Sequence, residues 1–153
     1  MNSGRILELL IEQDLTISFA ESMTGGFASY QLIKNSGASE AIKMSIVAYS
    51  NEHKEKILNI SADDIIKHTV VSPEIALMMA RSIKELSSSD IGVGVTGNAG
   101  PTVQDETEES VAYIGIVYNN EYVFRVEFHE LNREEAIKNC VEFIYNRLEE
   151  IIG

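Results

Sequence analysis

The sequence predicts an α/β fold in which helices cover both faces of a mixed, mainly parallel β-sheet. Strand-like and helix-like segments alternate up to residue 96, and this alternation is typical of parallel strands that are connected by helices. Two further strands follow one another directly near residue 120, where Asn119-Asn120 predicts a hairpin turn. A hairpin adds antiparallel strands, so we expect the sheet to be mixed.

Hydrophobic periodicity predicts the elements of the first half of the chain. The apolar residues at 6–11 share one helical face, with Glu8 and Glu12 on the other side. We expect Asn51 to cap one short helix, and Ser61 with Asp64 resembles a capping box at the next. The expected order is a helix at 6–11, a strand at 16–20, a polar turn at 21–26, a helix at 27–34, a strand at 41–49 and short helices at 51–58 and 61–68.

The second half begins with a longer helix that ends near Leu86. Ser72 is its expected N-cap and Pro73 its first helical residue, because proline has no N–H to lose at that position. Asn132 opens the last helix, which runs nearly to the end of the chain. Between them we expect a strand at 91–96, an acidic loop at 97–110 and the hairpin strands at 111–118 and 122–128.

Length and composition fit one globular domain over residues 1–153, and 44% of the residues are hydrophobic. The net charge of −12 argues against binding to nucleic acid, because phosphate backbones are repelled by an anionic surface. We expect no membrane span and no signal peptide, since apolar runs are short and Glu8 and Glu12 interrupt the first one. The single cysteine, Cys140, fits core packing and a reducing cytoplasmic location.

We expect no metal site. His53, His68 and His129 are far apart in the sequence and follow no metal-ligand spacing. The acidic residues between 105 and 109 are better explained by an exposed loop than by a cation site.

Three strand ends carry residues that could bind a ligand or take part in a reaction. Ser22 follows the first strand, and Gly25 and Gly26 after it permit positive φ and the close approach of a ligand. The next helix would direct free backbone N–H groups at a phosphate or an oxyanion. By spacing alone, an ordinary turn and helix cap is the better explanation of this segment.

The second and third strand ends would lie beside the first if the strands are parallel. Tyr49 ends the second strand and Lys54 lies one turn into the helix that follows, so both could converge on Ser22. A desolvated lysine can lose its proton near neutral pH and activate a serine hydroxyl. From these residues alone, a solvated Lys54 among Glu52, Glu55 and Lys56 is the favoured interpretation. The segment from Thr96 to Pro101 adds a third polar, glycine-containing end to the same crevice.

Taken together, these segments resemble the C-terminal domain of CinA, the competence-damage-inducible protein family. The resemblance rests on four segments in order, and it covers roughly residues 6–148: Ala20-Glu21-Ser22-Met23-Thr24-Gly25-Gly26, Val47-Ala48-Tyr49-Ser50-Asn51 with Lys54, Val71-Ser72, and Val95-Thr96-Gly97-Asn98-Ala99-Gly100-Pro101. It implies a three-layer α/β/α domain. It also implies an amidohydrolase that converts nicotinamide mononucleotide into nicotinic acid mononucleotide and ammonia.

The resemblance also implies roles for individual residues. Ser22 would be the nucleophile, Lys54 the base that activates it, and Tyr49 an assisting group. The implied partner is a small nucleotide substrate, with no cofactor, and the family's self-association through helices leaves a homo-oligomer open. The implied substrate-binding residues are Thr24, Gly25, Gly26, Thr96, Gly97, Asn98, Gly100 and Arg133.

Three departures from the family pattern concern the substrate more than the reacting pair. Met23 stands where the family usually has cysteine, which is a mild change. The segment 102–112 is acidic where the family has glycines and a Lys-Pro-Val-Gly sequence. Ile137 stands at about the position of a second arginine, so one guanidinium that could hold a phosphate is missing. A nucleotide-binding module without turnover, or a hydrolase of a less anionic amide, are therefore alternative functions.

Overall fold

The computed structural model describes residues 1–100 and 110–153, and it confirms the predicted α/β fold. Five strands form one sheet in the order β2-β1-β3-β4-β5. Strand β1 pairs in parallel with β2 and β3, whereas β4 pairs antiparallel with both β3 and β5. Only β4 therefore runs against the others. The strand bounds are Ile17–Glu21 (β1), Ile42–Val47 (β2), Ile91–Asn98 (β3), Val111–Tyr118 (β4) and Asn120–Glu127 (β5).

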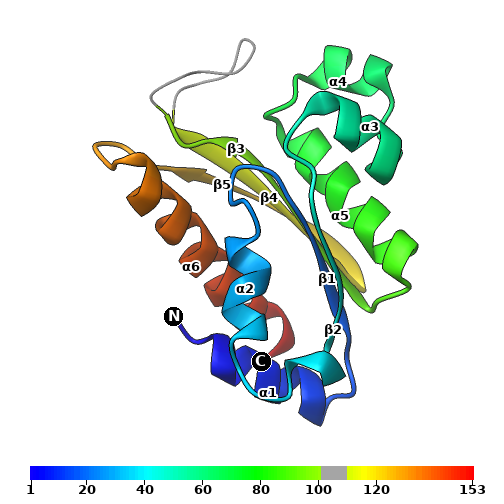
Figure 1. The fold of residues 1–153 in the computed structure, drawn as a ribbon, viewed down its shortest axis with the longest axis vertical. Helices are drawn as coiled ribbons and strands as arrows, with labels where there is room; N and C mark the ends of the chain where they lie inside the picture. The colour runs from blue at the N-terminus through cyan, green and yellow to red at the C-terminus, as the bar shows by residue number, and fades with distance from the viewer. Residues whose placement is uncertain (101–109) are drawn as a thin grey trace.

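Helices form a layer on each face of this sheet, as Figure 1 shows. One layer contains α1, α2 and α6, and the other contains α3, α4 and α5. The two termini lie close together, beside α1. The helix bounds are Ser3–Glu12 (α1), Phe27–Ile33 (α2), Ala38–Glu40 (the 3-10 helix η1), Asn51–Leu58 (α3), Ala62–His68 (α4), Pro73–Ser87 (α5) and Arg133–Ile152 (α6).

Helix starts agree with the predicted caps except at α3. Ser61, Ser72 and Asn132 each accept a hydrogen bond from a backbone N–H in the first turn of α4, α5 and α6. The expected cap of α3, Asn51, is wrong: Ser50 takes that role by accepting from the N–H of His53. A serine hydroxyl caps as well as an asparagine side chain, so the sequence alone does not decide between neighbouring candidates.

The strand β3 allows α5 to approach the sheet closely. A Cβ on Gly92 would lie 2.2 Å from the carbonyl oxygen of Ala80, and one on Gly94 would lie 2.4 Å from that of Ala76. Side chains at these positions would push the helix away, so glycine is required by packing. Because side chains alternate along a strand, the even-numbered residues of β3 face α5. Thr96 and Asn98 are therefore on the α5 face.

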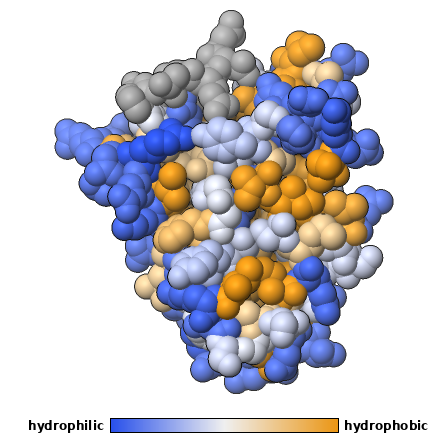
Figure 2. Space-filling view, in the orientation of Figure 1, coloured by the Kyte–Doolittle hydropathy of each residue, from blue (hydrophilic) through white to orange (hydrophobic). Residues whose placement is uncertain are grey.

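The outer strand β2 leaves part of the surface apolar. Figure 2 shows hydrophobic residues in the middle of one face, with hydrophilic residues around them. Val47 on β2 is 48% exposed, and Ile33 at the end of α2 is also exposed. Of the helices in the described ranges 1–100 and 110–153, none is both long and apolar enough to cross a membrane.

Candidate active site

The site is built at the carboxyl end of β1, where the chain leaves the sheet. The N–H of Ser22 still donates to the carbonyl oxygen of Val95 on β3, at 3.1 Å, so the serine is held like a strand residue. A tight turn follows, in which Gly25 and Gly26 have φ values of 59° and 98°. Residues with a side chain rarely adopt these left-handed conformations, and with glycine at both positions the chain turns directly into α2.

Lys54 reaches Ser22 from the first turn of α3. Its Nζ donates to Ser22 Oγ at 3.1 Å and lies 3.5 Å from the backbone carbonyl oxygen of Tyr49. The side chains are buried, with Lys54 only 1% and Ser22 only 4% exposed. The favoured interpretation of a solvated Lys54 is therefore wrong, and the capped start of α3 aims the amine at the strand end.

Burial changes the acidity of this lysine. Desolvation lowers the pKa of Lys54 from 10.5 to about 8, because the charged ammonium loses water without gaining a carboxylate partner among the described residues. A useful fraction of the amine is therefore neutral near physiological pH. A neutral amine within hydrogen-bond distance of a serine hydroxyl can accept its proton, which is the arrangement that nucleophilic catalysis requires.

Glu21, the residue before Ser22, is fully buried on the opposite face of the sheet. Its carboxylate accepts from the backbone N–H groups of Ala28 and Ser29 at 2.9 and 3.0 Å. It also accepts from the hydroxyls of Thr24 and Ser29 at 2.6 and 2.9 Å. Four hydrogen bonds and the positive end of α2 satisfy this charge, so no cation is needed beside it.

This arrangement overturns the expectation that α2 presents free N–H groups to a substrate. The Glu21 carboxylate already occupies the start of that helix, and a second anion there would meet a like charge. The backbone N–H groups of Met23, Thr24 and Gly26 differ, because within the described residues they make no hydrogen bond to another backbone group. These amides are the donors that the turn leaves available.

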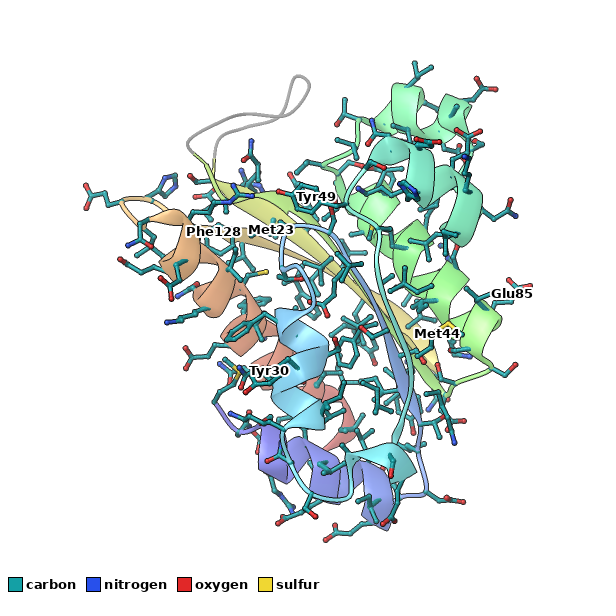
Figure 3. All side chains as sticks on the ribbon, in the orientation of Figure 1. Met23, Tyr30, Met44, Tyr49, Glu85 and Phe128 are labelled. Atoms are coloured by element: carbon teal, nitrogen blue, oxygen red, sulfur yellow. The ribbon has the colours of Figure 1, made fainter. Side chains whose placement is uncertain are left out.

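Arg133 connects two strand ends at the first residue of α6. One guanidinium nitrogen donates to the carbonyl oxygen of Gly100 at 3.0 Å, and the other donates to the Tyr49 hydroxyl at 2.7 Å. Tyr49 is half exposed, and its ring lies near the same end of the sheet as Met23 in Figure 3. The Tyr49 hydroxyl thus contacts Arg133, while its carbonyl oxygen faces Lys54.

The end of β3 supplies the remaining predicted residues, and the strand continues to Asn98 where a loop was expected from residue 97. Thr96 is buried and donates to the carbonyl oxygen of Val70 at 2.7 Å. A Cβ on Gly97 would lie 2.4 Å from the Met23 sulfur, so this glycine makes room for Met23. The side chain of Asn98 accepts from the N–H of Gly100 at 3.0 Å.

Comparison with known proteins identifies the family. The sequence model of the CinA C-terminal domain matches residues 2–152. The chain belongs to the CinA C-terminal domain family. A competence-damage inducible protein of Lysinibacillus sphaericus is 35% identical over 97% of this chain, and one of Clostridium kluyveri is 38% identical over 92%. The chain spans only 36% and 35% of the length of these curated relatives.

Solved structures of the CinA superfamily share the fold. A competence or damage-inducible protein of Enterobacter asburiae superposes with a TM-score of 0.94 at 24% identity, covering 99% of this chain and 96% of its own. An Agrobacterium tumefaciens protein described as competence/damage inducible has a TM-score of 0.85 at 27% identity, covering 98% of this chain and 91% of its own. The three-layer α/β/α architecture is thus common to this chain and to that superfamily.

Glu21 of this CinA domain has a structural role that the sequence did not reveal, whereas Cys140 has the role that it predicted. No local pattern predicts that Glu21 caps a helix whose first residue is six positions later. Burial, and secondarily the Glu21 charge, raise the pKa of the Cys140 thiol, which excludes it as a nucleophile near neutral pH. Its predicted place in the core is confirmed.

Two departures from the family pattern concern Ile137 and the acidic segment. Ile137 is partly buried and packs against the core cluster that contains Ala136 and Cys140, so its side chain serves packing. Most of the acidic segment, residues 101–109, lies outside the described residues. Among the residues that the structure describes, no three His, Cys, Asp or Glu side chains gather as a metal site would require.

Proposed function

We propose that this CinA domain hydrolyses the carboxamide of nicotinamide mononucleotide to nicotinic acid mononucleotide and ammonia. Ser22 is the nucleophile, Lys54 is its base, and no cofactor takes part. The observation that carries the proposal is the 3.1 Å contact between Lys54 Nζ and Ser22 Oγ, combined with the pKa of about 8 for the lysine.

The reaction proceeds in two stages. Ser22 Oγ attacks the amide carbon while the neutral Lys54 amine takes the hydroxyl proton. The tetrahedral intermediate then collapses: the carbon–nitrogen bond breaks, Lys54 returns its proton to the leaving nitrogen, and ammonia departs. Water attacks the resulting ester with Lys54 again as the base, which releases the carboxylic acid and restores Ser22.

Backbone donors would stabilise the negative oxygen of the intermediate. The N–H groups of Met23, Thr24 and Gly26 are available within the described residues, and they follow directly after the nucleophile. Removal of one such donor typically costs about a hundredfold or more in turnover, because the charge develops where no water can replace the contact. Glu21 supports this arrangement by fixing the turn through the Thr24 hydroxyl.

The remaining substrate residues line the neighbouring strand ends. The guanidinium of Arg133 contacts both the Tyr49 hydroxyl and the carbonyl oxygen of Gly100. In this proposal Arg133 attracts the phosphate, Tyr49 assists by holding the guanidinium, and Thr96, Gly97, Asn98 and Gly100 shape the pocket wall. Gly25 keeps the turn tight enough for the substrate to reach Ser22.

A second candidate is the same chemistry on a less anionic amide. Ile137 offers no guanidinium, and Glu21 fills the helix start that would otherwise attract a phosphate. Both observations favour a substrate without a phosphate, such as nicotinamide riboside. A third candidate, a binding module without turnover, is favoured by the same loss of anion-binding groups.

Ammonia release by purified protein tests the proposal. Wild-type protein is expected to release ammonia from nicotinamide mononucleotide, and Ser22→Ala to lose at least a thousandfold of that rate. Full activity in Ser22→Ala would overturn the mechanism. Activity on nicotinamide riboside alone would select the second candidate, and a folded protein that binds the nucleotide without releasing ammonia would select the third.

A further inference from the structure

Asn98 carries a buried donor that the fold does not satisfy. Its side chain is 3% exposed, and its Nδ2 has no hydrogen-bond partner within the described residues. The orientation of the amide is fixed, because Oδ1 accepts from the N–H of Gly100 and the opposite atom must therefore be the nitrogen. An unsatisfied buried donor is unfavourable for the fold, and a ligand with an acceptor in reach would satisfy it.

This donor lies on the same face of the sheet as the catalytic pair. Asn98 is an even-numbered residue of β3, and those residues face α5, as the close contacts of Gly92 and Gly94 show. Its partner on β4, Val111, belongs to the hydrophobic cluster on that same face. Lys54 approaches Ser22 from α3, which covers this face too.

The register of the strands gives the spacing between Asn98 and the nucleophile. Glu21 pairs with Val95, so Ser22 is level with Thr96, two residues before Asn98. Two residues along one strand and one step across to its neighbour separate the backbones by roughly 8 Å. With its carboxamide held at Ser22, a nicotinamide nucleotide could not contact Asn98 through that group. The ribose, which is attached on the far side of the pyridine ring, could extend to Asn98.

We propose that Asn98 is a specificity-determining residue whose Nδ2 donates to a ribose hydroxyl of the bound nucleotide. This inference rests on the proposed function, because it places the carboxamide at Ser22. The ligand must offer a hydrogen-bond acceptor to this site, because the Nδ2 of Asn98 can only donate. A ribose hydroxyl can accept from Asn98 and still donate elsewhere, so it satisfies the amide without introducing charge.

The substitution Asn98→Asp tests this contact with little change in shape. The carboxylate would keep the acceptor for the Gly100 N–H but would replace the donor by an oxygen. The measurement is the Kd by calorimetry, made in Ser22→Ala protein so that no ligand is consumed. The two ligands are nicotinamide mononucleotide and its 2′,3′-dideoxy analogue, which carries the same phosphate and therefore the same repulsion by the new carboxylate.

We expect Asn98→Asp to weaken binding of the ribonucleotide about tenfold more than binding of the dideoxy analogue. Ser18→Ala is the matched control, because Ser18 Oγ is also buried without a partner among the described residues but lies toward the opposite end of β1. It should leave both affinities unchanged. An equal loss for both nucleotides would overturn the inference, since the hydroxyls would then play no part.

The outcome is separable from that of the proposed function. Absence of ammonia release by wild-type protein, together with a ribose-dependent effect of Asn98→Asp, would reject the hydrolase and retain the contact. Ammonia release without any ribose-dependent effect would retain the hydrolase and reject the contact.

Discussion

Glu21 and Ser22 are neighbours in the chain, but their side chains face opposite layers of the molecule. On the α2 side, the Glu21 carboxylate is fully buried and accepts four hydrogen bonds of ordinary length. On the α5 side, Ser22 shares its hydroxyl with an amine that has lost most of its water and has no carboxylate partner among the described residues. The Glu21 carboxylate therefore has its hydrogen-bond partners, whereas no carboxylate among the described residues compensates the Lys54 amine.

The contrast separates stability from chemistry. A buried charge with all its hydrogen bonds made holds its neighbours in place and has little reason to react. A desolvated amine beside a hydroxyl is costly to the fold, and its lowered pKa is what makes it a base. Substitution of Lys54 should therefore affect turnover most, substitution of Glu21 should affect stability most, and the outer residue Tyr49 should affect either one less.

Lys54→Met is expected to have the largest effect on turnover. It should reduce ammonia release at least a thousandfold, because Ser22 loses its base while an apolar side chain still fills the space. Lys56→Met is the matched control, since Lys56 lies on the same helix and is exposed in an ion pair with Glu52. A loss of less than tenfold in Lys54→Met would show that another group activates Ser22.

The pH profile sharpens the same prediction. In wild-type protein the rate should rise with pH and level off above about 8, where the Lys54 amine is neutral.

The stability of the fold should also depend on pH through Lys54. Between pH 8 and 10.5 the amine is charged in the unfolded chain but neutral in the folded protein. The unfolded state then binds more protons, so the free energy of unfolding should rise with pH, by at most about 3 kcal/mol. Lys54→Met should lack this rise in a denaturant titration.

Glu21→Gln is expected to have the largest effect on stability. The amide would present N–H groups where the helix and the hydroxyls already donate, so at least one buried donor loses its acceptor. We expect the free energy of unfolding to fall by about 2–3 kcal/mol, measured by denaturant titration at pH 7. Glu52→Gln, which removes an exposed carboxylate, should change it several-fold less. Equal effects of the two would mean that the buried charge does not stabilise the turn.

Tyr49→Phe is expected to have the smallest effect. The hydroxyl contacts Arg133 and not the reacting pair, so its removal should raise the KM for an anionic nucleotide about threefold to tenfold. Tyr30→Phe is the control, because Tyr30 on α2 is another half-exposed tyrosine. A fall of a hundredfold in kcat for Tyr49→Phe would instead place the hydroxyl in proton transfer.

The sequence predicted most of the fold because the signals are local. Alternating periodicities identified every strand and α-helix among the described residues, and Ser72-Pro73 predicted the start of α5 at the correct residue. The one mistaken cap, Asn51 for Ser50, involves two residues that can both do the task. The 3-10 helix η1 and the last two residues of β3 were not predicted, because glycine-rich segments carry little periodicity.

The sequence by itself determined where Ser22 and Tyr49 lie, just after β1 and β2, and that Lys54 lies in the first turn of the helix after β2. The tertiary structure decided what each of them contacts. Whether Lys54 loses its water depends on how α3 packs against the sheet. Glu21 accepts a hydrogen bond from the first turn of α2, because the turn brings the end of β1 beside the start of that helix. Asn98 has an unsatisfied donor for the same kind of reason: desolvation and hydrogen bonding depend on neighbours in space, which a linear pattern does not specify.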